Sequence, residues 1–164
     1  MVTLKTINYR GGIARFQVPS SWMEEYEPQG GGTFYEVGED TGTLRINVMD
    51  FESPADKVIG AKTAYDLLTS LESVGETECL PSGNAIARSS RTGLESGENL
   101  LIYTWHVGVC VTPTHFRMVV FTYTILAAQE HEPTMQQELE LLDRSIANGE
   151  YPAVRGVAGD YVHE

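Results

Sequence analysis

The sequence contains no hydrophobic run long enough to cross a membrane. A membrane-spanning helix needs about 20 consecutive apolar residues. The longest candidate, residues 107–126, is interrupted by Cys110, Thr112, Pro113, His115 and Arg117. The first residues, Met1–Lys5, also lack the basic region and apolar stretch of a secretory signal. We therefore expect a cytoplasmic protein that has no membrane partner.

Basic residues are scarce. The chain has 11 Lys and Arg residues against 23 Asp and Glu residues, which gives a formal net charge of −12. Nucleic acids and anionic lipids need a cation for each phosphate contact, and the arginines are scattered along the chain, so we exclude both as partners. The acidity has two interpretations. It attracts a basic protein partner, or it keeps a cytosolic protein soluble.

Cysteines are few, and they form no metal or redox motif. The two cysteines, Cys79 and Cys110, are far apart in the sequence, and neither belongs to a C-x-x-C pair. In a chain without an export signal we expect free thiols rather than a disulfide. Cys110 lies in an apolar run, which predicts a buried and unreactive thiol.

The common catalytic motifs are also missing. There is no G-x-S-x-G, H-E-x-x-H or dinucleotide-binding glycine fingerprint, and no Lys-Ser/Thr follows Gly30-Gly31-Gly32 to make a phosphate-binding loop. Carboxylate pairs carry little information in so acidic a chain. Only Asp50, at the end of an apolar strand, is a candidate for a buried carboxyl with a raised pKa. The sequence predicts no cofactor and favours a protein that is not an enzyme.

The residues that are present suffice for one ordinary domain. The chain has 164 residues, a mass of 18.1 kDa and 41% hydrophobic residues. This composition can bury a core without disulfides or metal ions. We expect a single α+β domain over residues 1–149. A C-terminal tail follows over residues 150–164, which contain few large apolar side chains.

Alternating hydrophobic residues predict several strands. In the first of these, residues 13–18, one face carries Ala14, Phe16 and Val18. Further strands are expected over residues 32–37, 43–51, 76–80, 84–92, 99–111 and 114–127. The last four follow one another directly and predict a consecutive antiparallel run.

Two helices are predicted by apolar residues at spacings of three and four. The first begins with the capping pattern Ser53-Pro54-Ala55-Asp56 and ends near Gly75. The second begins at Glu132-Pro133 and ends at Asn148-Gly149. We expect Asp143 on its outer face. Its apolar stripe consists of Met135, Leu139, Leu142 and Ile146.

The two strongest strands, residues 99–111 and 114–127, are joined by a tight turn. Pairing directly across this turn places Cys110 opposite His115, with His106 and Arg117 on the same face. A Cys–His pair at this separation can activate a thiol nucleophile, although no oxyanion donor is visible. His106 and Cys110 are about 13 Å apart along the strand, which is too far for one zinc ion, so we expect no metal site.

The arrangement of these elements indicates a fold class. Strands that cluster between two helices are typical of an α+β fold rather than a parallel α/β fold. The central strands are apolar on both faces, so we expect both faces to be covered. A three-layer α/β/α sandwich with a mainly antiparallel central sheet meets this requirement.

The segment Phe16-x-Val18-Pro19-x-x-Trp22, followed by a glycine-rich loop, a strand and a helix, resembles the Mog/PsbP-like α/β/α sandwich domains. The C-terminal part is also similar, since a long antiparallel hairpin precedes a helix that contains Leu142-Asp143-Arg144-Ser145-Ile146. The resemblance covers residues 10–148. Members of that superfamily include Ran-binding import factors, photosystem subunits, bacterial lipoproteins and uncharacterised bacterial proteins, so it implies non-enzymatic binding or assembly.

We therefore expect a bacterial-type, non-enzymatic protein-binding module, such as a secretion-associated chaperone, an adaptor or an immunity protein, whose acidic surface binds a basic protein. The predicted contact residues are Trp22, Glu24, Glu25, Tyr26 and Glu27. For Trp22 and Trp105 themselves we favour core positions, and an edge of a binding groove beside Tyr26 is the alternative for Trp22. The alternative function is a small-ligand-binding protein or enzyme with a pocket near Cys110, His115 and Arg117. The sequence leaves the oligomeric state open, because an edge strand can support a homodimer.

Overall fold

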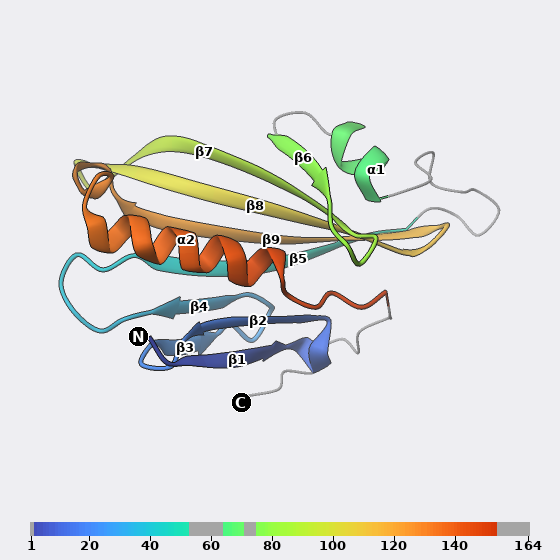
Figure 1. The fold of residues 1–164 in the computed structure, drawn as a ribbon, viewed down its shortest axis with the longest axis horizontal. Coiled ribbons are helices and arrows are strands. Elements are labelled where there is room, and N and C mark those ends of the chain that lie inside the picture. Colours follow the sequence, from blue (N-terminus) through green and yellow to red (C-terminus); the bar gives the residue numbers. More distant parts are fainter. Residues whose placement is uncertain (1, 53–63, 71–74, 154–164) are drawn as a thin grey trace.

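The described part of the chain folds into two antiparallel sheets and two α-helices (Figure 1). The structure is a computed structural model that describes residues 2–52, 64–70 and 75–153. Its α+β class and mainly antiparallel sheet confirm the prediction from the sequence. The elements are β1 (Leu4–Tyr9), η1 (Arg10–Gly12), β2 (Ala14–Pro19), β3 (Met23–Tyr26), β4 (Gly32–Tyr35), β5 (Thr43–Glu52), α1 (Ala64–Ser70), β6 (Glu76–Cys79), β7 (Ala85–Glu95), β8 (Glu98–Thr112), β9 (His115–Leu126), η2 (Ala127–Gln129) and α2 (Pro133–Ala147).

Seven strands form one sheet in the order β3-β4-β5-β9-β8-β7-β6, and β1 and β2 form a separate hairpin. The predicted consecutive run is confirmed, because β6 to β9 pair in sequence order. β5 pairs along its whole length with β9, from Thr43 opposite Thr124 to Glu52 opposite His115. This pairing places β9 at the centre of the sheet.

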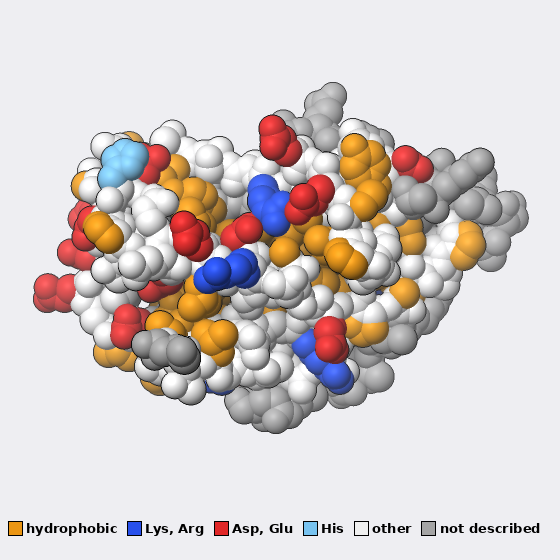
Figure 2. All heavy atoms as spheres, in the orientation of Figure 1, with side chains coloured by type: hydrophobic (Ala, Val, Ile, Leu, Met, Phe, Trp, Pro, Cys, Tyr) orange, Lys and Arg blue, Asp and Glu red, His pale blue; other side chains and the backbone are white. Residues whose placement is uncertain are grey.

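One face of the sheet, which we call the α2 face, is covered by α2 and the β1–β2 hairpin. Because side chains alternate along a strand, β8 and β9 send their odd-numbered residues to this face. Trp105 and Tyr123 are buried there. Phe16 of the hairpin meets Phe34 and Phe121 edge to face, with ring centroids 5.5 and 5.0 Å apart. These aromatic contacts hold the hairpin on the sheet, and charged side chains gather around α2 above them (Figure 2).

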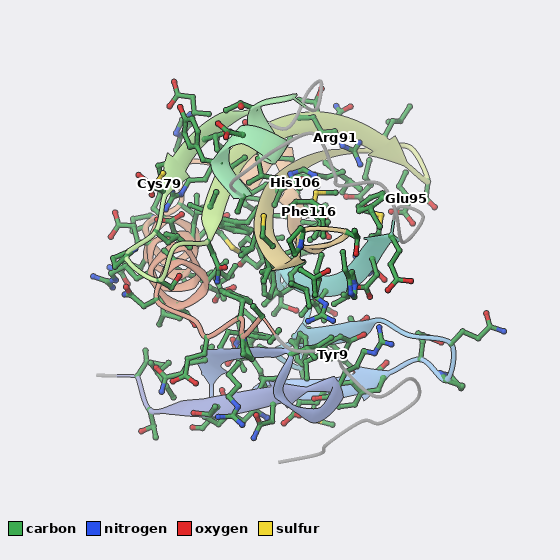
Figure 3. The ribbon with its side chains drawn as sticks, turned by 90° about the vertical axis from the view of Figure 1, so that its right-hand side faces the viewer. Tyr9, Cys79, Arg91, Glu95, His106 and Phe116 are labelled. Atoms are coloured by element: carbon green, nitrogen blue, oxygen red, sulfur yellow. The ribbon has the colours of Figure 1, made fainter. Side chains whose placement is uncertain are left out.

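The opposite face, which we call the α1 face, carries the shorter helix. Leu68 of α1 is buried together with Phe116, which lies beneath the helix (Figure 3). Gly108 allows the helix to approach closely, because a Cβ at this position would lie 3.0 Å from Leu68 Cγ. The other buried residues of this cluster are Ala64, Ala85, Ala87 and Met118. The two helices therefore lie on opposite faces of the sheet.

Several predicted elements are found and two strands are not foreseen. α2 confirms the second predicted helix, and its residues Leu142 and Ile146 are buried as expected. The predicted start of the first helix at Ser53 lies outside the described residues. The unforeseen strands are β1, which mixes polar and apolar residues on both faces, and the acidic β3.

Candidate functional site

Helix α2 lies exposed at the surface, with a groove along each of its sides (Figure 2). We call the space between α2 and the β1–β2 hairpin the hairpin groove, and the space between α2 and strands β7 and β8 the sheet groove. The helix takes this position because Leu142 and Ile146 are fully buried against the core. The side chains on the two flanks of α2 therefore line the two grooves.

The hairpin groove is the larger of the two, with a volume of about 930 Å³. Its floor is the face of the hairpin that points away from the core, and its wall is one side of α2. The lining mixes apolar and hydrogen-bonding side chains. They include Leu4, Thr6 and Gln17 from the hairpin and Gln137, Leu141 and Arg144 from α2.

Polar contacts fix the two walls of the hairpin groove to each other. The backbone N–H of Gln17 donates to Ser145 Oγ at 2.7 Å, and this hydroxyl donates to the Gln17 carbonyl. Arg15 and Glu150 exchange two backbone hydrogen bonds of 2.8 Å each. Tyr151 is buried and donates to the Ile146 carbonyl at 2.6 Å. The edge of β2 that faces α2 is therefore occupied, and the groove has a rigid frame.

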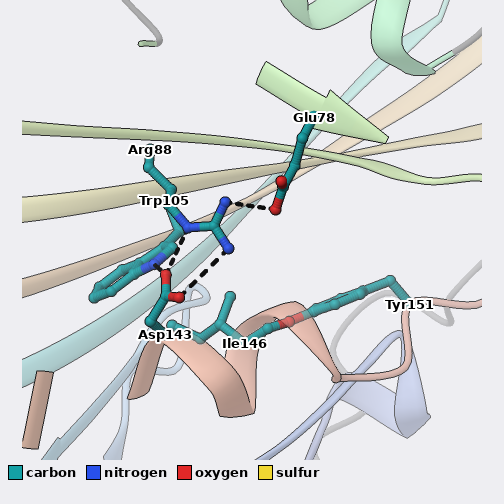
Figure 4. Close-up of polar contacts among 6 residues, drawn as sticks. All are labelled: Glu78, Arg88, Trp105, Asp143, Ile146 and Tyr151. Atoms are coloured by element: carbon teal, nitrogen blue, oxygen red, sulfur yellow. Dashed lines mark hydrogen bonds and ion pairs between the residues drawn. The ribbon is translucent and has the colours of Figure 1, made fainter. Parts of the chain in front are cut away.

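The sheet groove has a volume of about 540 Å³ and is lined in part by Tyr103, Trp105 and Leu139. At its end Asp143 Oδ1 accepts hydrogen bonds from Arg88 Nε at 2.6 Å and from Trp105 Nε1 at 2.9 Å (Figure 4). Our prediction that Asp143 lies on the outer face of α2 is therefore wrong. Arg88 points from β7 to the α2 face, where it draws this carboxylate against the sheet.

The same arginine also binds a second carboxylate. Arg88 Nη1 donates to Glu78 at 2.7 Å. Partial burial alone would lower the pKa of Arg88, but its hydrogen bonds to Asp143 and Glu78 raise the pKa above the usual value. The guanidinium therefore stays charged and acts as a fixed structural cation at the edge of the sheet groove.

Arg144 and Glu138 give the hairpin groove its charges next to α2. Arg144 lines both grooves, and it makes no ion pair with any described residue. Glu138 accepts a hydrogen bond from Tyr123 of β9. Burial and the nearby charge of Glu36 raise the pKa of Glu138 despite this bond. The helix thus carries one available cation and one carboxylate that is poorly solvated.

The residues predicted to contact a partner differ in their exposure to solvent. Trp22 is only 3% exposed and belongs to the core, so it is not a surface residue. Glu24 forms an ion pair with Lys5 at 2.8 Å and accepts a hydrogen bond from Tyr26 at 2.6 Å. The exposed members of the predicted set are Glu25 and Glu27.

The register predicted for the β8–β9 hairpin is wrong by one residue. Cys110 pairs with Phe116 rather than with His115, because a β-bulge next to Cys110 shifts the pairing. A slip of one residue moves every side chain of a strand to the other face. Cys110 and His106 therefore lie on the α1 face, whereas His115 and Arg117 lie on the α2 face. The predicted pocket is divided between the two sides of the sheet.

The two cysteines are free thiols, as predicted, but Cys110 is exposed rather than buried. Partial burial raises the pKa of the Cys110 thiol, and the negative charge of Asp66 raises it further. A catalytic thiol needs the opposite shift, because the thiolate is the nucleophile. The chemical environment of Cys110 is therefore not that of an activated cysteine.

His115 and Arg117 surround Asp50, which the pairing of β5 with β9 brings between them. Asp50 Oδ1 lies 2.7 Å from His115 Nε2 and accepts a hydrogen bond from Arg117 Nε at 3.0 Å. Burial would raise the pKa of Asp50, but the hydrogen bonds and charges of His115 and Arg117 together lower it. The prediction that Asp50 has a raised pKa is thus wrong, because it did not include the two partners on β9.

Among residues 2–52, 64–70 and 75–153, no three His, Cys, Asp or Glu side chains come together in a way that could hold a metal ion. In the same part of the chain, no helix has the length and apolar character that crossing a membrane requires.

Comparisons with known proteins identify relatives by fold alone. No protein-family model matches the sequence, and no curated protein matches it. A solved structure from Bacteroides thetaiotaomicron VPI-5482 is similar with a TM-score of 0.58 and 19% identity, over 90% of this chain and 48% of that chain. This chain thus spans about half of that protein. LpqN of Mycobacterium tuberculosis, a protein involved in cell envelope biogenesis, has a TM-score of 0.56 and 13% identity, over 80% of each chain.

Proposed function

We propose that this protein is a non-enzymatic binding module that holds a segment of a partner protein in the hairpin groove. The observation that carries this proposal is the shape of the groove, which is open and runs beside α2. A helix of 15 residues is about 22 Å long. A channel of this length suits an extended or helical segment of a polypeptide better than a small molecule, which pockets commonly enclose on most sides.

The lining of the hairpin groove supports a peptide occupant. Gln17, Gln137 and Thr6 can exchange hydrogen bonds with a peptide backbone, while Leu4 and Leu141 offer apolar contact. Arg144 can receive a carbonyl or carboxylate group of the bound segment. A mixture of apolar and hydrogen-bonding groups is typical of protein–protein interfaces.

We propose further that the partner is basic. The net charge of −12 creates a field that attracts cationic proteins and speeds their association. A secretion-associated chaperone, an adaptor or an immunity protein for a cationic effector would use such a field. This proposal predicts binding that weakens steeply as the salt concentration rises.

We also propose that the fold is a three-layer α/β/α sandwich of the Mog/PsbP-like kind. The positions of α1 and α2 on opposite faces of the sheet support the layers. The motif from Phe16 to Trp22 supports the resemblance, because Phe16, Val18 and Trp22 are all core residues of the structure. Non-enzymatic binding is common in that superfamily.

Capture of a partner from native lysate at low salt tests the proposed function. The matched variants are Leu4→Arg, in the hairpin groove, and Val37→Arg, on the β4–β5 loop, since both put a cation at an exposed apolar position. We expect the wild type and Val37→Arg to retain one basic protein that elutes in a salt gradient, and Leu4→Arg to lose it. Equal capture by both variants, or binding indifferent to salt, would contradict the proposal.

The sheet groove supports a second candidate function, the binding of a small ligand. Its volume of about 540 Å³ lies in the range of ligand pockets. Its lining combines apolar surface from Tyr103, Trp105 and Leu139 with charged side chains such as that of Arg88, and ligand pockets commonly join apolar walls to a few polar groups. This site replaces the predicted pocket near Cys110, His115 and Arg117. A change in the fluorescence of Trp105 on addition of an aromatic acid would support it, and a Trp105→Phe variant should lack this change.

A further inference from the structure

Strand β7 extends well beyond the strand that covers its outer edge. β6 pairs only with residues 85–88 of β7, although β7 continues to Glu95. Along residues 89–95, no described residue pairs with the side of β7 that faces away from β8. The segment has no proline, and its pairing with β8 has no bulge. A long regular edge of this kind is a template for another strand.

The turns at each end of β7 identify which backbone groups point outwards. In antiparallel sheets, alternate residues direct both N–H and C=O to the same neighbour. Leu80 N–H donates to the Asn84 carbonyl at 2.8 Å, so the even-numbered residues of β7 face the β6 side. From this alternation, the N–H and C=O groups of Thr92 and Leu94 point away from β8, in the plane of the sheet, towards the open edge.

The turn between β7 and β8 gives the same result. Ser96 and Gly97 have φ values of 51° and 81°, which are typical of a two-residue hairpin turn. Glu95 and Glu98 close this turn as the first pair of the β7–β8 ladder. The odd-numbered residues of β7 therefore direct their backbone groups to β8, which leaves the even-numbered residues for a strand outside.

Two opposite charges lie beside this open edge. Arg91 and Glu95 are exposed and project from the α1 face of β7 (Figure 3). They are about 13 Å apart along the strand, too far to pair within one chain. Neither forms an ion pair with any residue in the described part of the chain. A strand that joins this edge can therefore supply an opposite charge to Arg91 and to Glu95.

We propose that two copies of this chain pair antiparallel through the β7 edge, about a two-fold axis at Gly93. In this register Arg91 of each copy lies directly opposite Glu95 of the other copy. Thr92 of each copy then lies opposite Leu94 of the other, and their outward N–H and C=O groups form hydrogen-bonded pairs. The hydrogen-bond pattern and the charges thus agree on one register.

Other registers fail one of these two conditions. Sliding one strand by a single residue places the outward backbone groups out of phase. Sliding by two residues removes the opposite charge from Arg91 and Glu95. Sliding by four brings Arg91 against Arg91 or Glu95 against Glu95, which is unfavourable.

Gly93 suits the position on the two-fold axis. A residue on this axis faces its own copy, with Cα atoms about 4.5 Å apart in a pair without hydrogen bonds. Glycine weakens a strand interior, and where no bulge is present it often marks the close approach of another backbone. The proposed dimer also covers part of Leu94, which is 72% exposed in the single chain.

Charge reversal tests this register in the full-length protein. Analytical ultracentrifugation of the wild type should show a dimer that dissociates on dilution. Arg91→Glu and Glu95→Arg should each weaken the dimer about tenfold or more, because like charges then face each other. A mixture of the two variants should form a heterodimer, and the double variant should again pair with itself. Arg45→Glu, on β5, is the control for the change in net charge.

A proline substitution tests the backbone part of the proposal. Thr92→Pro removes an N–H that points out of the sheet, so the fold should persist while the dimer is lost. Circular dichroism checks that the variant folds. A wild type that is monomeric at every concentration would overturn the proposal, as would a dimer that survives both Arg91→Glu and Thr92→Pro.

Discussion

Arg88 on β7 and Asp143 on α2 form a bidentate ion pair, with Arg88 Nε 2.6 Å from Asp143 Oδ1 and Arg88 Nη2 3.4 Å from Asp143 Oδ2. Trp105 donates to the same carboxylate at 2.9 Å. One carboxylate therefore joins the helix to two neighbouring strands, β7 and β8. This junction adds a polar anchor to the apolar contacts of Leu142 and Ile146 that hold α2 on the sheet.

Asp143→Ala should destabilise the fold by about 1 kcal/mol. Hydrogen bonds to charged groups contribute about 1.5–3 kcal/mol, and we reduce this value because the side chains of Arg88 and Asp143 are 34% and 38% exposed. Glu78→Ala is the matched control and should cost less than about 0.5 kcal/mol, since Glu78 is 57% exposed. Urea unfolding measures both, and equal losses would contradict the role of Asp143.

Asp50→Asn should destabilise the protein at neutral pH by about 1–2 kcal/mol. The substitution leaves the buried Arg117 and His115 without this carboxylate. The folded state lowers the pKa of Asp50 from 3.8, so its stabilisation is present above that value and is lost as the pH falls through the lowered pKa. Acid titration of the unfolding free energy should show a shallower decline in Asp50→Asn than in the wild type.

Glu138→Gln should raise the stability at neutral pH. The folded state raises the pKa of Glu138 from 4.5, so ionisation opposes folding as the pH rises above 4.5 and continues to do so through the raised pKa. A glutamine is neutral and can still accept the hydrogen bond from Tyr123. Thermal unfolding at several pH values should show the gain at neutral pH and none in acid, where Glu138 is protonated. Glu140→Gln, an exposed change on the same helix, should give a smaller effect.

Cys110 should react with iodoacetamide in the native state, but more slowly than an unperturbed thiol at neutral pH. Its side chain is exposed, and the raised pKa reduces the fraction of thiolate. Mass spectrometry of the labelled peptides, with Cys79 as the internal reference, measures the rates. Labelling of Cys110 that is much faster than that of Cys79 would indicate an activated thiol and would favour an enzyme.

Local patterns in the sequence suffice for much of the fold. The four strands from β6 to β9 and the helix α2 follow directly from periods of two and of three to four residues. β1 is missed because Lys5 and Thr6 interrupt its apolar pattern, and β3 is missed because glutamates dominate it. These strands form because neighbouring elements supply a core, to which β1 contributes Ile7 and Tyr9, and local periodicity does not report this contribution.

Features that depend on contacts between segments far apart in the sequence cannot be predicted from local patterns. A single bulge beside Cys110 reverses the faces of His115 and Arg117 relative to the prediction. The salt bridges of Asp50 and Asp143 depend on which strands become neighbours, and helical periodicity alone assigns Asp143 to solvent. The hairpin groove is likewise formed by segments at opposite ends of the chain.

Hydrogen–deuterium exchange of the protein, with and without the basic partner captured from lysate, tests whether a partner protein occupies the hairpin groove. We expect the partner to slow exchange in residues 2–8 and 134–148 and to leave exchange in β7 unchanged. Protection confined to other segments, or no protection at all, would contradict this proposal.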